Sequence, residues 1–337
     1  MSCRILPVLL VLSMSLLAQG GVVPSSGQSA STYYVNPHAG QILASFDRGA
    51  DGQLYYSTGD AYWDLGFNVY QFNGTIANPI YSNPNAFAGS RVTAIGDNVY
   101  FNDGGDYSPR GYAYFKYSIG AGTISALNLQ NNLGSLEVRN GNELWAAGGT
   151  PAAICATPLD VEGNPMSNPL VNLGTIGGNY GAMAFDTAGN LYYAEGYRPS
   201  GNSLIYKFSA TEVQAALDDP VTTPLTPDGH EWVTVTGNFT GCTGMAFNTE
   251  GDLLVTTTKF LVPSELRAYH IDPYGANAGY SLLASGTGRL DTIRVFNETV
   301  YVSDADGIYS ITPAPEPATL ILFSLAGLLA RRNQRED

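Results

Sequence analysis

The chain has 337 residues, of which 44% are hydrophobic and only 13% are charged, a balance too apolar for intrinsic disorder. Its 15 basic and 29 acidic residues give a net charge of −14, and nucleic acids and anionic membrane surfaces recruit proteins through basic patches. Neither is therefore an expected partner of the central part of the chain. The 39 Gly, 22 Tyr and 19 Pro indicate many strands joined by tight turns and predict an all-β fold.

The first 20 residues have the pattern of a cleavable secretory signal. Arg4 precedes an apolar run over residues 5–17, and Ala18 and Gly20 place small side chains at positions −3 and −1 of a cut after Gly20. The run is shorter than a bilayer-spanning helix requires, which favours cleavage over a retained anchor. We expect residues 1–20 to be a signal peptide and residues 21–31 to form a linker.

The central part contains an internal repeat. Residues 182–191 align without a gap with residues 244–253, and each segment reads as a strand, a tight polar turn and the start of another strand. Similar turns precede six apolar residues spaced by 45, 45, 47, 62 and 47 positions, namely Leu54, Val99, Leu144, Leu191, Leu253 and Val300. A period near 46 residues is typical of a four-stranded propeller blade.

The remaining strands of each repeat follow from the same register. Apolar runs after the turns predict second strands that are buried on both faces. Third strands are expected at residues 69–72, 113–117, 204–208, 266–269 and 308–311, and fourth strands at 78–81, 123–127, 170–173, 232–235 and 280–284. The sixth repeat has no fourth strand, and its exposed edge needs a partner, for which residues 32–35 are the natural candidate.

These observations predict an all-β, six-bladed β-propeller over residues 32–312, closed by an N-terminal strand and flanked by N- and C-terminal apolar helices. The longest interval contains an insertion in which Ser209 and Glu212 form a capping-box pattern. A short helix is expected there, on the outer side of the fourth blade. Through residues 244–248 and 251–255 the repeat resembles NHL-type and gluconolactonase-like six-bladed propellers.

Loops between the second and third strands of the blades gather around one mouth of a propeller channel. Hard oxygen ligands there would suit Ca²⁺, as the resemblance to metal-dependent gluconolactonases implies, and the metal candidates are Asp103, Asp106, Glu195, Asp304 and Asp306. Aromatic side chains in the same loops would suit stacking on sugar rings, and the ligand-binding candidates are Tyr62, Trp63, Tyr107 and Tyr197. The alternative is that the acidic residues serve the turns and the aromatic residues the core.

No catalytic residue is assigned, because no histidine lies near these loops and no Gly-x-Ser-x-Gly motif occurs. Two hypotheses remain open. The first is a non-enzymatic scaffold that binds polysaccharide or an envelope protein and needs no cofactor. The second is a Ca²⁺-dependent lactonase-like hydrolase with its site at the channel mouth.

The last 25 residues, 313–337, form a distinct tail. The motif Pro315-Glu316-Pro317 precedes an apolar block over residues 318–330 and the pair Arg331 and Arg332, an order typical of a short membrane helix held by cytoplasmic arginines. The tail resembles the PEP-CTERM sorting signal of Gram-negative bacteria that make exopolysaccharide. The resemblance implies export, a transient stay in the inner membrane, handling by an exosortase, and a final place at the cell surface or in the extracellular matrix.

Overall fold

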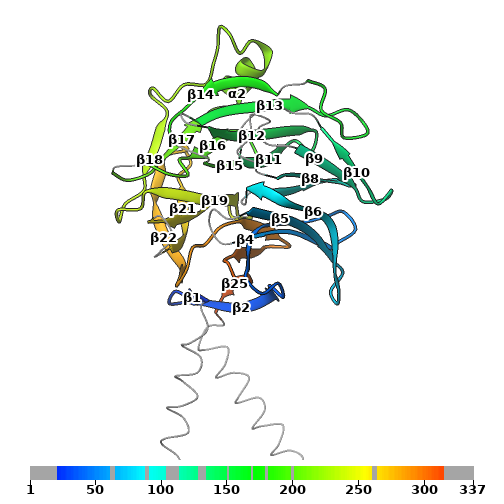
Figure 1. Ribbon diagram of the computed structural model, residues 1–337. Coiled ribbons are helices and arrows are strands. Elements are labelled where there is room, and N and C mark those ends of the chain that lie inside the picture. Colours follow the sequence, from blue (N-terminus) through cyan, green and yellow to red (C-terminus); the bar gives the residue numbers. More distant parts are fainter. Residues whose placement is uncertain are drawn as a thin grey trace, which may run out of the picture.

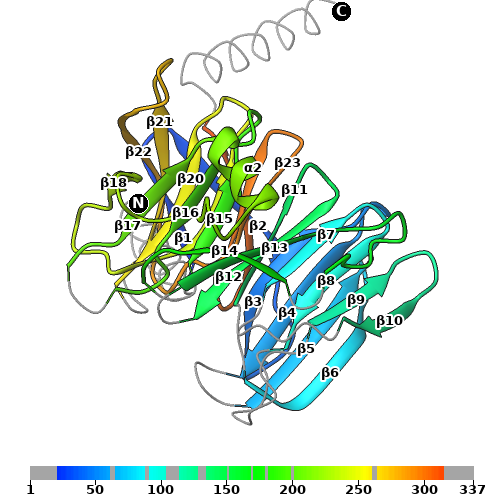
Figure 2. The same cartoon turned by 90° about the horizontal axis from the view of Figure 1, so that it is seen from above.

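The computed structural model describes residues 21–60, 65–87, 91–103, 114–127, 134–149, 152–167, 170–178, 181–198, 201–259 and 264–314. Six antiparallel sheets surround a common centre, where the first strands of successive blades contact one another (Figure 1). Within a blade the strands pair in chain order, as β3 to β6 of the first blade do in Figure 2. The six-bladed propeller with four-stranded blades that the repeat period predicts is confirmed.

The first three blades each contain four consecutive strands. Blade 1 consists of β3 (Gln41–Arg48), β4 (Leu54–Asp60), β5 (Leu65–Phe72) and β6 (Ala77–Phe87). Blade 2 consists of β7 (Val92–Ile95), β8 (Asn98–Asn102), β9 (Tyr114–Ser118) and β10 (Thr123–Ala126). Blade 3 consists of β11 (Ser135–Arg139), β12 (Glu143–Gly149), β13 (Ala152–Pro158) and β14 (Val171–Thr175).

The last three blades include the two N-terminal strands. Blade 4 consists of β15 (Ala182–Phe185), β16 (Leu191–Ala194), β17 (Leu204–Phe208) and β18 (Glu231–Thr234). Blade 5 consists of β19 (Gly241–Phe247), β20 (Leu253–Thr258), β21 (Ser264–Ile271), β22 (Asn277–Gly286) and β1 (Val22–Pro24). Blade 6 consists of β23 (Ile293–Phe296), β24 (Thr299–Ser303), β25 (Gly307–Pro313) and β2 (Gln28–Val35).

An N-terminal strand completes the last blade, as the missing fourth strand of the sixth repeat predicts. β2 runs antiparallel to β25, from Gln28 opposite Pro313 to Val35 opposite Gly307. β25 therefore has hydrogen-bonded neighbours on both sides, and the edge that would otherwise expose its peptide groups is covered. β2, from the N-terminal part of the chain, and β25, the last strand, therefore meet in one sheet.

The expected linker over residues 21–31 is corrected by the structure. β1 pairs with the outer strand of blade 5, with Val22 opposite Gly286, and β2 already begins at Gln28. The outer edge of β22 offers unpaired peptide groups, and three extended residues suffice to bond with them. So short a strand carries no readable alternation of apolar and polar residues.

The hydrophobic core lies between neighbouring blades. Tyr55 and Phe67 of blade 1 pack with Val99 and Phe101 of blade 2, and all four side chains are fully buried. Because each second strand is covered by a blade on either side, apolar side chains on both of its faces are removed from water. This explains the continuous apolar runs that mark the repeat.

The insertion in blade 4 forms the predicted helix, α2 (Ala210–Asp218), between β17 and β18. Its capping box is complete, since Ser209 Oγ accepts from the Glu212 amide and the Glu212 carboxylate accepts from the Ser209 amide. Val213 and Ala216 are the buried residues of the helix, and the helix lies at the periphery of the ring (Figure 1).

The predicted signal peptide, residues 1–20, the expected flanking apolar helices and the sorting motif Pro315-Glu316-Pro317 with Arg331 and Arg332 all lie outside the described residues. Across the described ranges, no helix is long and apolar enough to cross a membrane. The strands of the ring continue to Pro313, one residue beyond the predicted boundary.

Candidate functional site

The face that the sequence singles out is where each blade's first strand begins and its second strand ends. Three metal candidates are described at the ends of second strands: Asp103 after β8, Glu195 after β16 and Asp304 after β24. All three side chains are nearly buried, with relative exposures of 3%, 3% and 4%. The hydrogen bonds of each show what its carboxylate does.

Glu195 is bound to the third strand of its own blade. Its Oε2 accepts from the Leu204 amide at 3.0 Å and its Oε1 accepts from the Tyr206 hydroxyl at 3.2 Å. An ion pair with Arg198 at 3.5 Å adds a third contact. Both carboxylate oxygens thus hold the start of β17 and the following loop in place.

Asp304 caps the turn between β24 and β25. Its Oδ1 accepts from the amides of Asp306 and Gly307, both at 2.9 Å. Burial raises the pKa of the Asp304 carboxyl to about 6, against the action of those two amide hydrogen bonds. The fourth described candidate, Asp306, is exposed at the tip of the same turn.

Asp103 joins two blades. Its Oδ2 accepts from the Tyr81 hydroxyl and from Asn83 Nδ2, both at 2.7 Å, and both donors belong to β6 of blade 1. Desolvation is the largest cause that raises the pKa of the Tyr81 hydroxyl, and the hydrogen bond to Asp103 raises it further. This hydroxyl therefore remains a donor at any physiological pH. The carboxylate therefore fastens the outer strand of blade 1 to blade 2.

Among the residues that the structure describes, no group of three or more His, Cys, Asp or Glu side chains lies close enough together to hold a metal ion. Asp106, Tyr62, Trp63 and Tyr107 lie outside those residues. Tyr197 is described and is 36% exposed, two residues after Glu195 on the same loop. The calcium site and the sugar-binding role of these residues remain predictions.

A charged cluster that the sequence analysis does not identify crosses the channel itself. Arg294 of β23 forms ion pairs with Asp47 of β3 at 3.2 Å and with Glu137 of β11 at 3.3 Å, and its Nη2 donates to the Val92 carbonyl. Blades 3 and 6 lie opposite each other in a six-bladed ring, as Figure 1 shows. The pair between Glu137 and Arg294 therefore spans the centre of the ring.

The partners of Arg294 are themselves fixed by the backbone. Asp47 accepts from the amides of Arg48 at 2.8 Å and Ala94 at 2.9 Å, and Glu137 accepts from the Val138 amide at 3.1 Å. Burial raises the pKa of Glu137, and the Arg294 guanidinium acts most strongly in the opposite direction. The sequence signal for this cluster is a charged residue within each of three largely apolar innermost strands.

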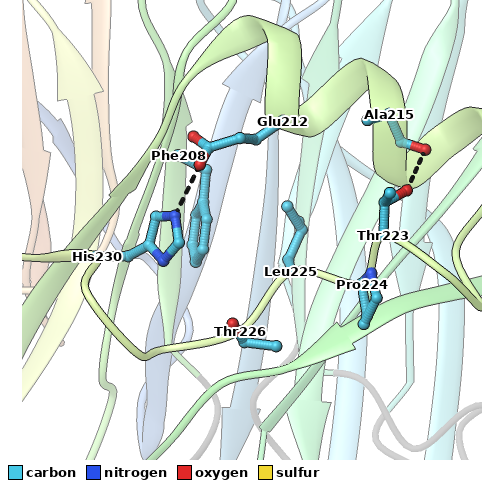
Figure 3. A pocket seen from close by; sticks show the side chains of 8 residues that line it. All are labelled: Phe208, Glu212, Ala215, Thr223, Pro224, Leu225, Thr226 and His230. Carbon is cyan, nitrogen blue, oxygen red and sulfur yellow. Dashed lines mark hydrogen bonds and ion pairs between the residues drawn. The ribbon is translucent and has the colours of Figure 1, made fainter.

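A separate cavity of about 170 Å³ lies beneath α2, on the outside of blade 4 (Figure 3). His230 stacks on Phe208 with ring centroids 4.6 Å apart, and its Nε2 lies 2.9 Å from Glu212 Oε1. The hydrogen bond with His230 is the largest cause that lowers the pKa of Glu212 to about 2. Because Glu212 and His230, the two ionisable groups that line this cavity, bind each other, we interpret the cavity as part of the contact between α2 and blade 4.

Comparison with known proteins places the fold without placing the activity. No protein-family model matches the chain, and no curated protein matches it by sequence. Among solved structures, it is similar to the calcium form of a family AA12 carbohydrate-active enzyme from Trichoderma reesei, with a TM-score of 0.58 and 10% identity, covering 88% of this chain and 98% of that one.

Two further structures show the same likeness. The PQQ-bound aldose sugar dehydrogenase of Streptomyces coelicolor has a TM-score of 0.56 and 12% identity over 86% of this chain and 100% of that one. A protein assigned as a gluconolactonase has a TM-score of 0.53 and 11% identity over 86% and 93% of the two chains. At these identities the similarity shows the fold alone, and the chain has the six-bladed propeller that these proteins share.

Proposed function

We propose that this chain is an exported six-bladed propeller that serves as a binding scaffold, with polysaccharide or another envelope protein as its partner. The observation that supports a scaffold best is the use made of the acidic residues at the mouth. Asp103, Glu195 and Asp304 accept hydrogen bonds within and between blades. A calcium-dependent hydrolase would need such carboxylates to face a common point on the axis.

The proposed address rests on the two termini. The ring begins with β1 at Val22, directly after the expected cut, and ends at Pro313, just before Pro315-Glu316-Pro317. In this proposal, both targeting segments are appendages, and the described strands of the ring all lie between them. We infer that an exosortase processes the tail after a transient stay of residues 318–330 in the inner membrane, which leaves the propeller at the cell surface or in the matrix.

A glycan array tests the binding role, using residues 21–314, which contain every described strand. A scaffold is expected to bind one or more matrix polysaccharides, with and without EDTA. The same protein is assayed for lactone hydrolysis. If the protein binds no glycan and hydrolyses a lactone in a reaction that EDTA abolishes, the scaffold hypothesis is refuted and the hydrolase is favoured.

Sorting is tested separately with the full chain in a Gram-negative host that carries an exosortase. The double substitution Pro315→Ala and Pro317→Ala is expected to leave the chain in the inner-membrane fraction with its tail intact, as mass spectrometry of the C-terminus would reveal. A matched change outside the motif, Pro313→Ala, serves as the control. If the double variant reaches the surface with the same C-terminus as the parent, the tail is not a sorting signal.

A further inference from the structure

Three arginines lie in or beside the channel of a protein that is otherwise strongly acidic. Of the 11 Lys and Arg residues between positions 21 and 315, three belong to the channel: Arg91, Arg289 and Arg294. Arg91 immediately precedes β7, while Arg289 precedes β23 and Arg294 lies within it. The propeller ring brings together side chains that are about 200 positions apart in the chain, since Arg91 Nη1 donates to Thr292 Oγ1 at 3.4 Å.

The charges in the channel are separated into two layers. Deep in the channel, Arg294 faces two carboxylates, Asp47 and Glu137, which leaves this layer one negative charge in excess. At the starts of the innermost strands, Arg289 pairs with Asp291 at 2.8 Å, and Arg91 takes part in none of the ion pairs formed among the described residues. Of these two arginines, Arg91 is therefore the one without a carboxylate partner among the described residues.

Arg91 and Arg289 have donor groups to spare. The hydrogen bond to Thr292 uses one of the five N–H groups of the Arg91 guanidinium. Arg289 Nε is buried and has no acceptor within the part of the chain that the structure describes. Desolvation is the main cause that lowers the pKa of Arg91 to about 10, and the charge of Asp291 acts in the opposite direction. Buried donors without partners often mark the place of a ligand.

We propose that Arg91 and Arg289, supported from below by Arg294, form a carboxylate-binding site at the channel mouth that takes a single acidic sugar unit, a uronate. The planar fork of a guanidinium matches a carboxylate through two parallel hydrogen bonds. The carboxylate part of the proposal rests on the arginines, and the sugar part rests on the binding role proposed above.

Size and overall charge limit the ligand. The ion pair of Arg294 with Glu137 crosses the channel, so a ligand at the proposed site is expected to enter from the mouth and to reach no deeper than this pair. The net charge of −14 repels an extended polyanion, whereas a single acidic unit at the end of a saccharide needs only the guanidinium groups of Arg91 and Arg289. The site therefore suits a terminal acidic sugar better than a continuous stretch of a charged polymer.

Calorimetric titration of the ring, residues 21–314, with glucuronate, glucose, acetate and inorganic phosphate tests the site. Glucuronate is expected to bind at least tenfold more tightly than glucose, and its affinity is expected to fall as NaCl rises from about 50 to 500 mM. Arg91→Gln is expected to weaken glucuronate binding by about tenfold or more, the size of a lost charged hydrogen bond. The control Arg48→Gln removes a charge from the opposite, exposed end of β3 and should leave the affinity unchanged.

Each outcome decides the proposal. If the parent does not bind glucuronate, or if Arg91→Gln and Arg289→Gln both bind it as the parent does, the site is refuted. If circular dichroism shows that Arg91→Gln does not fold, the glucuronate affinity of Arg289→Gln tests the site instead. Phosphate binding tighter than glucuronate binding would refute the carboxylate assignment. Binding of neutral glycans without glucuronate binding would leave the scaffold role intact, and glucuronate binding without any glycan binding would leave the site intact.

Discussion

Replacing Arg294 with methionine removes the cation that spans the channel and leaves Asp47 and Glu137 facing each other's charge. Arg294 is 8% exposed and Asp47 is 8% exposed, so little water reaches the vacated space. Breaking a buried ion pair by removing one partner costs about 3–5 kcal/mol, because the other charge stays buried without compensation. We expect Arg294→Met to lose that much free energy of unfolding at pH 7.5.

The cost should depend on pH in a direction that the structure determines. Burial already raises the pKa of Glu137, and Arg294 is the strongest influence that lowers it, so its removal raises the pKa further. A carboxyl whose folded pKa exceeds its unfolded value favours the folded state at low pH, and this advantage is lost as the pH rises. The destabilisation of Arg294→Met should therefore be smaller at pH 5 than at pH 8.

Thermal and urea unfolding, followed by circular dichroism, measure both effects. For a domain of this length, 3–5 kcal/mol corresponds to a fall in Tm of about 5–8 °C. Arg48→Met, at the exposed end of the same channel strand as Asp47, is the matched control. The double variant Arg294→Met with Glu137→Met should recover part of the loss. A Tm for Arg294→Met within about 1 °C of the control at pH 7.5 would show that the cluster does not hold the ring together.

Three further predictions concern single contacts. Because the folded pKa of Asp304 is about 6, above its ordinary value, the parent should lose stability as the pH rises from about 4 to 6. Asp304→Asn should abolish this loss and raise the free energy of unfolding at pH 7 by about 1–3 kcal/mol. A pH profile of Tm like that of the parent would contradict this. Gly174→Ala should cost about 1–3 kcal/mol in urea unfolding, since its Cβ would overlap the Leu225 carbonyl, and an unchanged midpoint would be evidence against that contact. Ser209→Ala should cost about 1 kcal/mol of helix stability and speed amide exchange within α2, while exchange in the innermost strands stays as in the parent.

Local signals account for the parts of the fold that the sequence predicts. The turn and apolar run that precede Leu191 and Leu253 are contiguous in the chain, and so is the capping box of Ser209 and Glu212. The closing strand is predicted by counting, because a sixth blade without a fourth strand has an edge that must be covered. The sequence does not predict β1 and β13. β1 has only three residues, and β13 (Ala152–Pro158) is rich in small side chains.

The candidate site is harder to predict because an acidic residue in a loop has two common uses. Glu195 and Asp304 lie where a calcium ligand would lie, yet their oxygens accept hydrogen bonds from neighbouring residues of the same blade. Arg294 and Glu137 pose the opposite problem. They are 157 positions apart, and neither strand contains a local pattern that indicates the partner. Only the closed ring brings the two opposite blades together.

The pairing of β2 with β25 has a mechanical consequence. The tail leaves the ring from the end of β25, and the Ala314 amide donates to the Gly27 carbonyl beside it. Force applied through the tail acts on a strand that is hydrogen-bonded on both sides, along seven paired positions with β2 and four with β24. An edge strand would peel from its sheet one bond at a time, whereas β25 must shear past two neighbours together. The ring is thus built to bear load at the point where its tail is attached.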